Sequence, residues 1–237
     1  MDFFLYITYI TAIIPLLVFL FNINKNKNTS TRVIFYYVVY SLINEVLMYF
    51  LRSRHYKYDT ELEAILMWSF TFFEFLFFSI FLYSSLSKKA NRRLLLVASA
   101  LFVLSAVLNL VFNFSQSSHV KVFDTLPISI SAITLIIFCI IYLFEKIQSP
   151  EIGFVYATPN FWIVVGIMIY FAGTFFLFLQ YSELSVQEQD NFWIINWICI
   201  ILKNIFFSIA FYLTEKNKNP TYENSLNSTA EMELNKN

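Results

Sequence analysis

The stretch that decides the fold is Trp197–Phe211, WICIILKNIFFSIAF, in which one lysine interrupts an otherwise apolar run. The run extends from 192 to 213 around Lys203, which is long enough to cross the roughly 30 Å hydrocarbon core of a bilayer as a helix. An ammonium group at the centre of a bilayer costs about 2.5–3.5 kcal/mol on insertion scales. The stretch therefore predicts a membrane helix whose lysine has a partner inside the protein.

The composition of the whole chain is typical of an integral membrane protein. Hydrophobic residues make up 58% and charged residues 14% of the 237 residues. A soluble domain is about a quarter charged, so the chain is depleted in charge. The formal net charge is zero, and we expect no nucleic-acid partner. Only three glycines are present, which excludes a glycine-rich phosphate loop.

Seven stretches are long and apolar enough to span a bilayer. They cover residues 3–23, 33–51, 62–83, 94–114, 126–144, 161–180 and 192–213. Asp124, Thr158 and Asp190 are predicted to cap the last three helices. The sequence therefore predicts an all-α integral membrane protein, with a seven-transmembrane-helix bundle at 1–213. The polar residues 214–237 are predicted to form a disordered cytoplasmic tail.

The lysine and arginine residues predict the orientation of the bundle. Ten of those near the spans fall on the side of the first, third and fifth loops and the start of the C-terminal tail, and four fall on the opposite side. Because positive residues are enriched in cytoplasmic loops, we expect the N-terminus outside and the C-terminus in the cytoplasm. A multi-pass protein of a bacterial inner membrane, with the lipid bilayer as its surroundings, is the expected location.

Three ionisable residues are predicted at membrane depth: Glu45, Glu74 and Lys203. Counting 1.5 Å per residue from each helix start places all three near the bilayer midplane. A lysine beside a carboxylate is the least costly way to keep either charge there. The sequence leaves open whether Lys203 pairs with Glu45 or with Glu74.

Other residues share helix faces with this trio. The predicted polar core adds Asn44, Asn196 and Asn204, and Glu63 is predicted at the outer mouth above Glu74. Further polar or close-packing positions are Asn109, Asn113, Tyr170, Gly166 and Gly173.

Each of these residues also has a purely structural interpretation. The charged trio can be an ion pair that fixes helix packing, and membrane asparagines are ordinary interhelical hydrogen-bonding groups. The two glycines of one helix face permit close helix approach. Tyr36, Tyr37 and Tyr40 are expected to anchor their helix at the membrane interface.

Metal and catalytic sites are not indicated. His55 and His119 fall in predicted loops, whereas an intramembrane metal hydrolase needs ligands at membrane depth. No Ser–His pair or paired aspartates occur at that depth, so no catalytic residue is predicted. An enzyme acting on lipid headgroups through Glu45 and Glu74 remains an alternative. Cys139 and Cys199 lie inside predicted spans, which argues against a structural disulfide.

Two alternatives use the buried charges directly. A proton- or solute-coupled transporter would use them as a relay, although interrupted helices, the usual sign of a midplane substrate site, are few. A retinal protein would form a Schiff base at Lys203, and the chain resembles microbial rhodopsins in helix count, orientation and this lysine. It lacks the arginine before the counter-ion and the Trp-x-x-Tyr pattern of the retinal pocket.

The interpretation that we prefer is a sensor or accessory module that signals through a partner by way of the buried Glu/Lys cluster. The segments FWIVVGIMIYFAGTFFLF (161–178) and NWICIILKNIFFSIAFYL (196–213), with the Phe/Ile/Asn/Lys-rich composition, carry a resemblance. The chain resembles the small seven-transmembrane-helix proteins of Bacteroidota that often accompany sensor histidine kinases. This resemblance implies a membrane histidine kinase as the partner and implies no cofactor.

Overall fold

The computed structural model describes residues 2–24, 26, 28–54, 60–115, 125–148, 155–180 and 183–213. Within these ranges the chain is helical and contains no β-strand. The helices are α1 (Asp2–Phe21), α2 (Thr29–Arg54), α3 (Thr60–Ser85), α4 (Lys89–Ser115), α5 (Thr125–Ile147), the 3-10 helix η1 (Val155–Ala157), α6 (Pro159–Gln180) and α7 (Val186–Tyr212).

The helices have the length and composition of membrane spans. Six of the described helices, α2 to α7, are long and apolar enough to cross a bilayer, and α1 is shorter in its apolar part, Tyr6–Phe21. Large apolar side chains such as Phe21, Leu101 and Phe176 point outward and are more than 60% exposed in the isolated chain. An outward apolar surface on every helix suits a lipid environment. The prediction of an all-α, multi-pass membrane protein is confirmed at this level.

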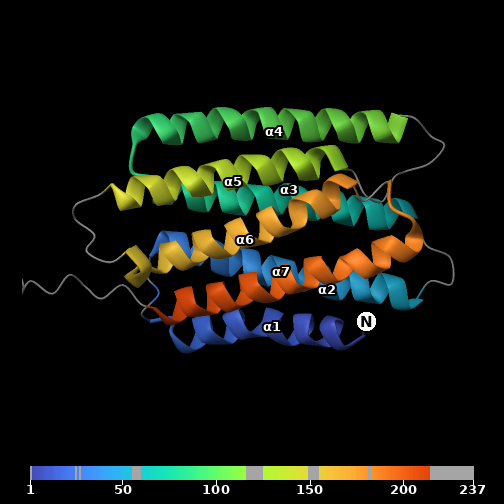
Figure 1. The fold of residues 1–237 in the computed structure, drawn as a ribbon, viewed down its shortest axis with the longest axis horizontal. Helices are drawn as coiled ribbons and strands as arrows, with labels where there is room; N and C mark the ends of the chain where they lie inside the picture. The colour runs from blue at the N-terminus through green and yellow to red at the C-terminus, as the bar shows by residue number, and fades with distance from the viewer. Residues whose placement is uncertain are drawn as a thin grey trace, which may run out of the picture.

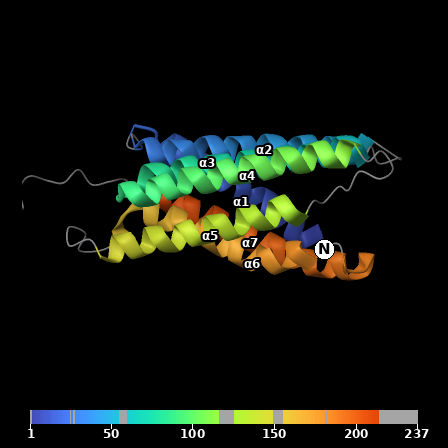
Figure 2. The ribbon, with the colours of Figure 1, turned by 90° about the horizontal axis from the view of Figure 1, so that it is seen from above.

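The helices run alternately up and down along one axis (Figure 1). We call the end at which α1, α3, α5 and α7 begin the N-terminal end of the bundle, and the opposite end the C-terminal end. Helix α7 packs between α1 and α6, α6 packs on α5, and α3 packs on both α2 and α5. Helix α4 lies at the edge of the bundle against α3 and α5 (Figures 1 and 2).

The observed helices α2 to α5 extend beyond their predicted spans at both ends, because polar residues continue the helix past the apolar core. The largest difference is at α7, which begins at Val186, so the prediction that Asp190 caps this helix is wrong. Ser185 precedes the helix, and its backbone N–H and side-chain Oγ both donate to Glu188 Oε2, at 2.9 and 2.7 Å. A serine followed three residues later by glutamate is a common helix start, and it places Asp190 inside the helix.

Helix α6 begins directly after Thr158, as predicted, but the side-chain hydrogen bond of Thr158 is to η1 and not to the first turn of α6. Pro159 is its first residue, and Thr158 precedes it, with Oγ1 donating to the Val155 carbonyl at 2.8 Å. Proline suits this position because the first helical N–H has no partner in the helix. The predicted cap Asp124, both histidines and the tail 214–237 lie outside the described residues.

Candidate functional site

A lysine, a tyrosine and a glutamate from three helices meet inside the bundle. Lys203 Nζ on α7 donates a hydrogen bond to Tyr37 Oη on α2 at 2.6 Å. Tyr37 Oη donates in turn to Glu74 Oε1 on α3, also at 2.6 Å. The ammonium nitrogen and the carboxylate oxygen are 3.6 Å apart and form a buried ion pair. We call these three residues the Lys203–Tyr37–Glu74 cluster.

Aromatic rings enclose the ammonium group. Lys203 Nζ lies 4.0 Å from the centre of the Tyr170 ring on α6 and 5.1 Å from that of Tyr37. The rings of Phe78 and Phe207 pack on Tyr37, with centres 4.4 and 6.2 Å away. A cation above the face of an aromatic ring is attracted to it, most strongly where water is excluded. The cluster thus combines charge pairing, hydrogen bonding and cation–π contact.

The structure answers which glutamate pairs with Lys203. The ion pair is with Glu74, while Glu45 is half-buried and has no ion-pair partner among the described residues. Glu45 lies eight residues after Tyr37, about 12 Å along α2 toward the N-terminal end. The structure thus pairs Lys203 with Glu74 and leaves Glu45 outside the ion pair.

The remaining members of the predicted polar core are buried beside the cluster or between it and the N-terminal end of the bundle. Asn44 and Asn196 lie toward the N-terminal end, Asn204 lies beside Lys203, and all three are less than 9% exposed. Asn196 Oδ1 is buried and has no hydrogen-bond partner among the described residues. Glu63, predicted at the outer mouth above Glu74, is buried near the start of α3.

The two glycines of α6 allow α7 to approach closely. A Cβ atom at Gly173 would lie 2.4 Å from Cys199 Sγ, and one at Gly166 would lie 3.2 Å from Phe206 Cβ. A real Cβ atom could not lie so close to the Cys199 sulfur. The absence of a side chain at Gly173 therefore lets α6 and α7 approach closely, one turn from the contact of Tyr170 with Lys203. These contacts agree with the close-packing interpretation of both glycines.

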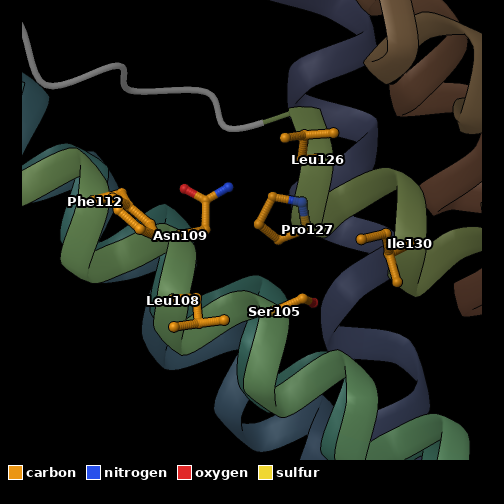
Figure 3. Close-up of a pocket in the computed structure, with 7 residues that line it drawn as sticks. All are labelled: Ser105, Leu108, Asn109, Phe112, Leu126, Pro127 and Ile130. Atoms are coloured by element: carbon orange, nitrogen blue, oxygen red, sulfur yellow. The ribbon is translucent and has the colours of Figure 1, made fainter.

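The polar stripe predicted on α4 lies away from the cluster. Ser105 and Asn109 line an open groove of about 450 Å³ between α4 and α5, together with apolar side chains that include Phe112 and Pro127 (Figure 3). The groove lies on the side of the bundle that α4 covers, so these residues are not part of the buried cluster. Asn113 belongs to α4, and its side chain lies outside the described residues.

Sequence reasoning missed two residues with structural roles. Tyr37, predicted as an interface anchor, is 1% exposed and bridges the ion pair, whereas Tyr36 is 59% exposed. The contrast arises because neighbouring residues of a helix point in directions about 100° apart.

Glu145 is the second missed residue. It is buried near the end of α5 and accepts hydrogen bonds from the Ser87 N–H at 2.6 Å and from Asn91 Nδ2 at 2.6 Å, at the start of α4. A negative charge at a helix N-terminus is stabilised by the helix dipole, so these hydrogen bonds from Glu145 hold the end of α5 against the start of α4. The only signal in the sequence is an acidic residue directly after an apolar run.

The fold and the cluster define an all-α, multi-pass membrane protein with a charged pair in its interior. No protein-family model, curated protein or solved structure matches this chain.

Proposed function

We propose that the protein is a membrane sensor or accessory module that passes a signal to a partner protein through the Lys203–Tyr37–Glu74 cluster. The observation that carries the proposal is that one cluster ties together α7, α2 and α3. Intramembrane charges are costly, and their positions commonly mark a functional site. A change of charge at this point would alter the packing of three helices together.

Glu45 gives the cluster a second arrangement. It lies on the same helix as Tyr37, is half-buried, and is near enough to Lys203 for their charges to interact. If Glu74 loses its charge, Lys203 is drawn toward Glu45, the other acid facing it. Two pairings of one lysine make a bistable element, which is what a switch requires. The partner that fits the resemblance in the sequence is a histidine kinase of a bacterial inner membrane.

The alternatives have less support from the geometry. A retinal Schiff base needs space for a polyene at the amine, where the Tyr170 ring lies 4.0 Å away. A transporter with a midplane substrate site commonly uses interrupted helices, whereas α2 to α7 are continuous where described. An enzyme acting on lipid headgroups would need its two carboxylates near the interface, and Glu74 is committed to Lys203.

The proposal is tested first by co-purification from native membranes, which should recover a sensor histidine kinase with this protein, and failure to recover one would count against it. Autophosphorylation of the kinase is measured with the wild-type chain, with Lys203→Met and with Glu45→Gln. Lys203→Met should abolish the effect on the kinase, and Glu45→Gln should hold the protein in one state. Lys89→Met, at an exposed lysine of α4, is the matched control. Equal kinase activity with all four folded chains would rule out this function.

A further inference from the structure

Positive charge is concentrated at the C-terminal end of the bundle, where α4 begins and α5 ends (Figure 1). Three residues, Leu86, Ser87 and Lys88, join α3 to α4, and we call them the α3–α4 turn. The basic residues of this turn, of the start of α4 and of the end of α5 are Lys88, Lys89, Arg92, Arg93 and Lys146. Glu145 is the one acidic residue that the structure describes in these three segments, so five positive charges face one negative charge.

Glu145 does not neutralise these cations, because its carboxylate is directed at the backbone of the turn. Its oxygens accept hydrogen bonds from the Ser87 and Lys88 N–H groups, at 2.6 and 3.2 Å, and from Asn91 Nδ2 at 2.6 Å. Glu145 is 6% exposed, and among the described residues it forms no ion pair with a lysine or arginine. The negative charge therefore supports the turn from inside the bundle, and the positive charges remain without a counter-charge.

Arg92 is held in place by neutral groups. Its Nε atom donates to the Leu86 carbonyl at 2.7 Å, and its guanidinium carbon lies 5.7 Å from the centre of the Tyr83 ring. The side chain is half-buried and has no acidic partner in the part of the chain that the structure describes. A guanidinium group held in this way is already ordered before a ligand binds, and its planar N–H groups match the oxygen atoms of a phosphate.

Two lysines beside the same turn also have neutral partners. Lys146 Nζ on α5 donates to Ser87 Oγ at 3.3 Å. Lys88 Nζ donates to Gln148 Oε1 at 3.5 Å. Neither ammonium group pairs with an acid within the described ranges. Three ordered cations thus surround the α3–α4 turn, and an anion placed there would form charge-assisted hydrogen bonds with them.

Exposed apolar side chains begin directly beside these cations. On α4, Leu94 and Val97 are 54% and 58% exposed, and on α5, Phe144 and Ile147 are 59% and 74% exposed. In a chain whose helices cross a bilayer, the hydrocarbon chains of lipids cover such a surface. A ligand that contacts both the cations and these apolar side chains must combine a negative group with hydrocarbon. An anionic phospholipid has this combination, whereas a soluble anion leaves the apolar part uncovered.

We propose that the α3–α4 turn binds the phosphate group of an anionic phospholipid from the surrounding bilayer. Arg92, Lys146 and Lys88 contact the phosphate oxygens, and the acyl chains lie along the exposed apolar surface of α4 and α5. Lysine and arginine residues next to a membrane helix attract anionic lipids, and each one strengthens the binding about fivefold. The site therefore distinguishes lipids by the charge of the headgroup.

The lipid preference is tested by native mass spectrometry of the full chain in detergent micelles. The protein is titrated with dioleoyl phosphatidylglycerol or with dioleoyl phosphatidylethanolamine, which have the same acyl chains but differ in net charge. The wild type should bind phosphatidylglycerol more than about tenfold more tightly, and the preference should decrease as the salt concentration rises. Equal affinity for the two lipids would overturn the proposal without the use of any variant.

The residues of the site are tested by removing single charges. Arg92→Gln and Lys146→Gln should each weaken phosphatidylglycerol binding about fivefold and leave phosphatidylethanolamine binding unchanged. They lie on different helices, so a folding failure of one variant leaves the other. Lys89→Gln is the matched control, because Lys89 is exposed in the first turn of α4 and its ammonium group has no hydrogen bond or ion pair with a described residue.

The control variant should change the affinity less than about twofold, since an exposed charge that is not held in place contributes little. An equal loss in all three variants would show a general attraction between charges and would overturn the site. Complete displacement of phosphatidylglycerol by millimolar sodium phosphate at constant ionic strength would overturn the assignment to a lipid.

A protein partner at the turn is the other outcome to be tested. Crosslinking of Lys146 to an acidic protein in native membranes, together with equal binding of the two lipids, would assign the turn to that protein instead. None of these measurements involves a kinase or the Lys203–Tyr37–Glu74 cluster. The lipid site can therefore fail while the proposed sensor function stands, and the reverse.

Discussion

Two groups of side chains next to the Lys203–Tyr37–Glu74 cluster solve different physical problems. Toward the C-terminal end, the phenylalanine group, Phe78, Phe207 and Phe211, is fully buried, and toward the N-terminal end Asn44 and Asn196 are buried amides. Lipid is as apolar as the core, so apolar burial does not drive helix association, and tight packing must hold the phenylalanine group together. The amides must instead satisfy their polar atoms inside the bundle.

The cluster sits between these two groups. Lys203 lies one turn before Phe207 and one turn after Cys199. An ion pair at the protein surface would have little effect on helix packing, whereas one enclosed by helices has a large effect when a partner is removed. The comparison teaches that this charged pair is held between close aromatic packing and other buried polar side chains.

The largest expected effect comes from removing the ammonium group of Lys203. Lys203→Met should destabilise the protein by about 3–5 kcal/mol, because Glu74 is left buried without its counter-charge. The free energy of unfolding can be measured by denaturant titration in mixed micelles. The double variant Lys203→Met, Glu74→Gln should recover much of the loss, since no uncompensated charge remains. A double variant less stable than Lys203→Met would contradict the ion pair.

The phenylalanine group is tested by a cavity. Phe207→Ala should cost about 2–3 kcal/mol, less than in a water-soluble core, because only packing and not transfer from water is lost. The free energy of unfolding in mixed micelles measures the loss. Phe192→Ala, at a 45% exposed position of the same helix, is the matched control and should cost well under 1 kcal/mol.

The hydroxyl group of Tyr37, which bridges Lys203 and Glu74, is tested by removing that one oxygen atom. Tyr37→Phe should cost about 2 kcal/mol, because the ammonium and the carboxylate each lose one charge-assisted hydrogen bond. Tyr36→Phe, at the exposed neighbour, should leave thermal stability in detergent unchanged. If both variants unfold at the same temperature as the wild type, the hydroxyl does not join the two charges.

The smallest effect is expected where α6 meets α7. Gly173→Ala should cost about 1 kcal/mol through overpacking, because its Cβ would lie 2.4 Å from Cys199 Sγ. The combined change Gly173→Ala, Cys199→Ala should restore the melting temperature by removing the sulfur atom. Failure of this rescue would show that the limit to helix approach lies elsewhere.

Much of the fold could be predicted from the sequence. Apolar runs of about 20 residues, separated by short polar segments, have the length that a helix needs to cross a bilayer. The helix ends could not be predicted in the same way. Ser185 and Asp190 are both residue types that precede helices, and only the folded structure shows that α7 begins after Ser185. The location of the charged residues at membrane depth was also readable, because charge is rare there.

The sequence by itself determined that a membrane helix would carry Lys203 inward and that an acid would meet it. Only the tertiary structure decided that the acid is Glu74, that Tyr37 bridges the pair, and that Glu45 lies outside it. The reason is geometric: the rise along one helix is fixed at 1.5 Å per residue, but the offset between helices depends on where each one starts and how closely it packs. That offset is set by contacts between residues far apart in the chain.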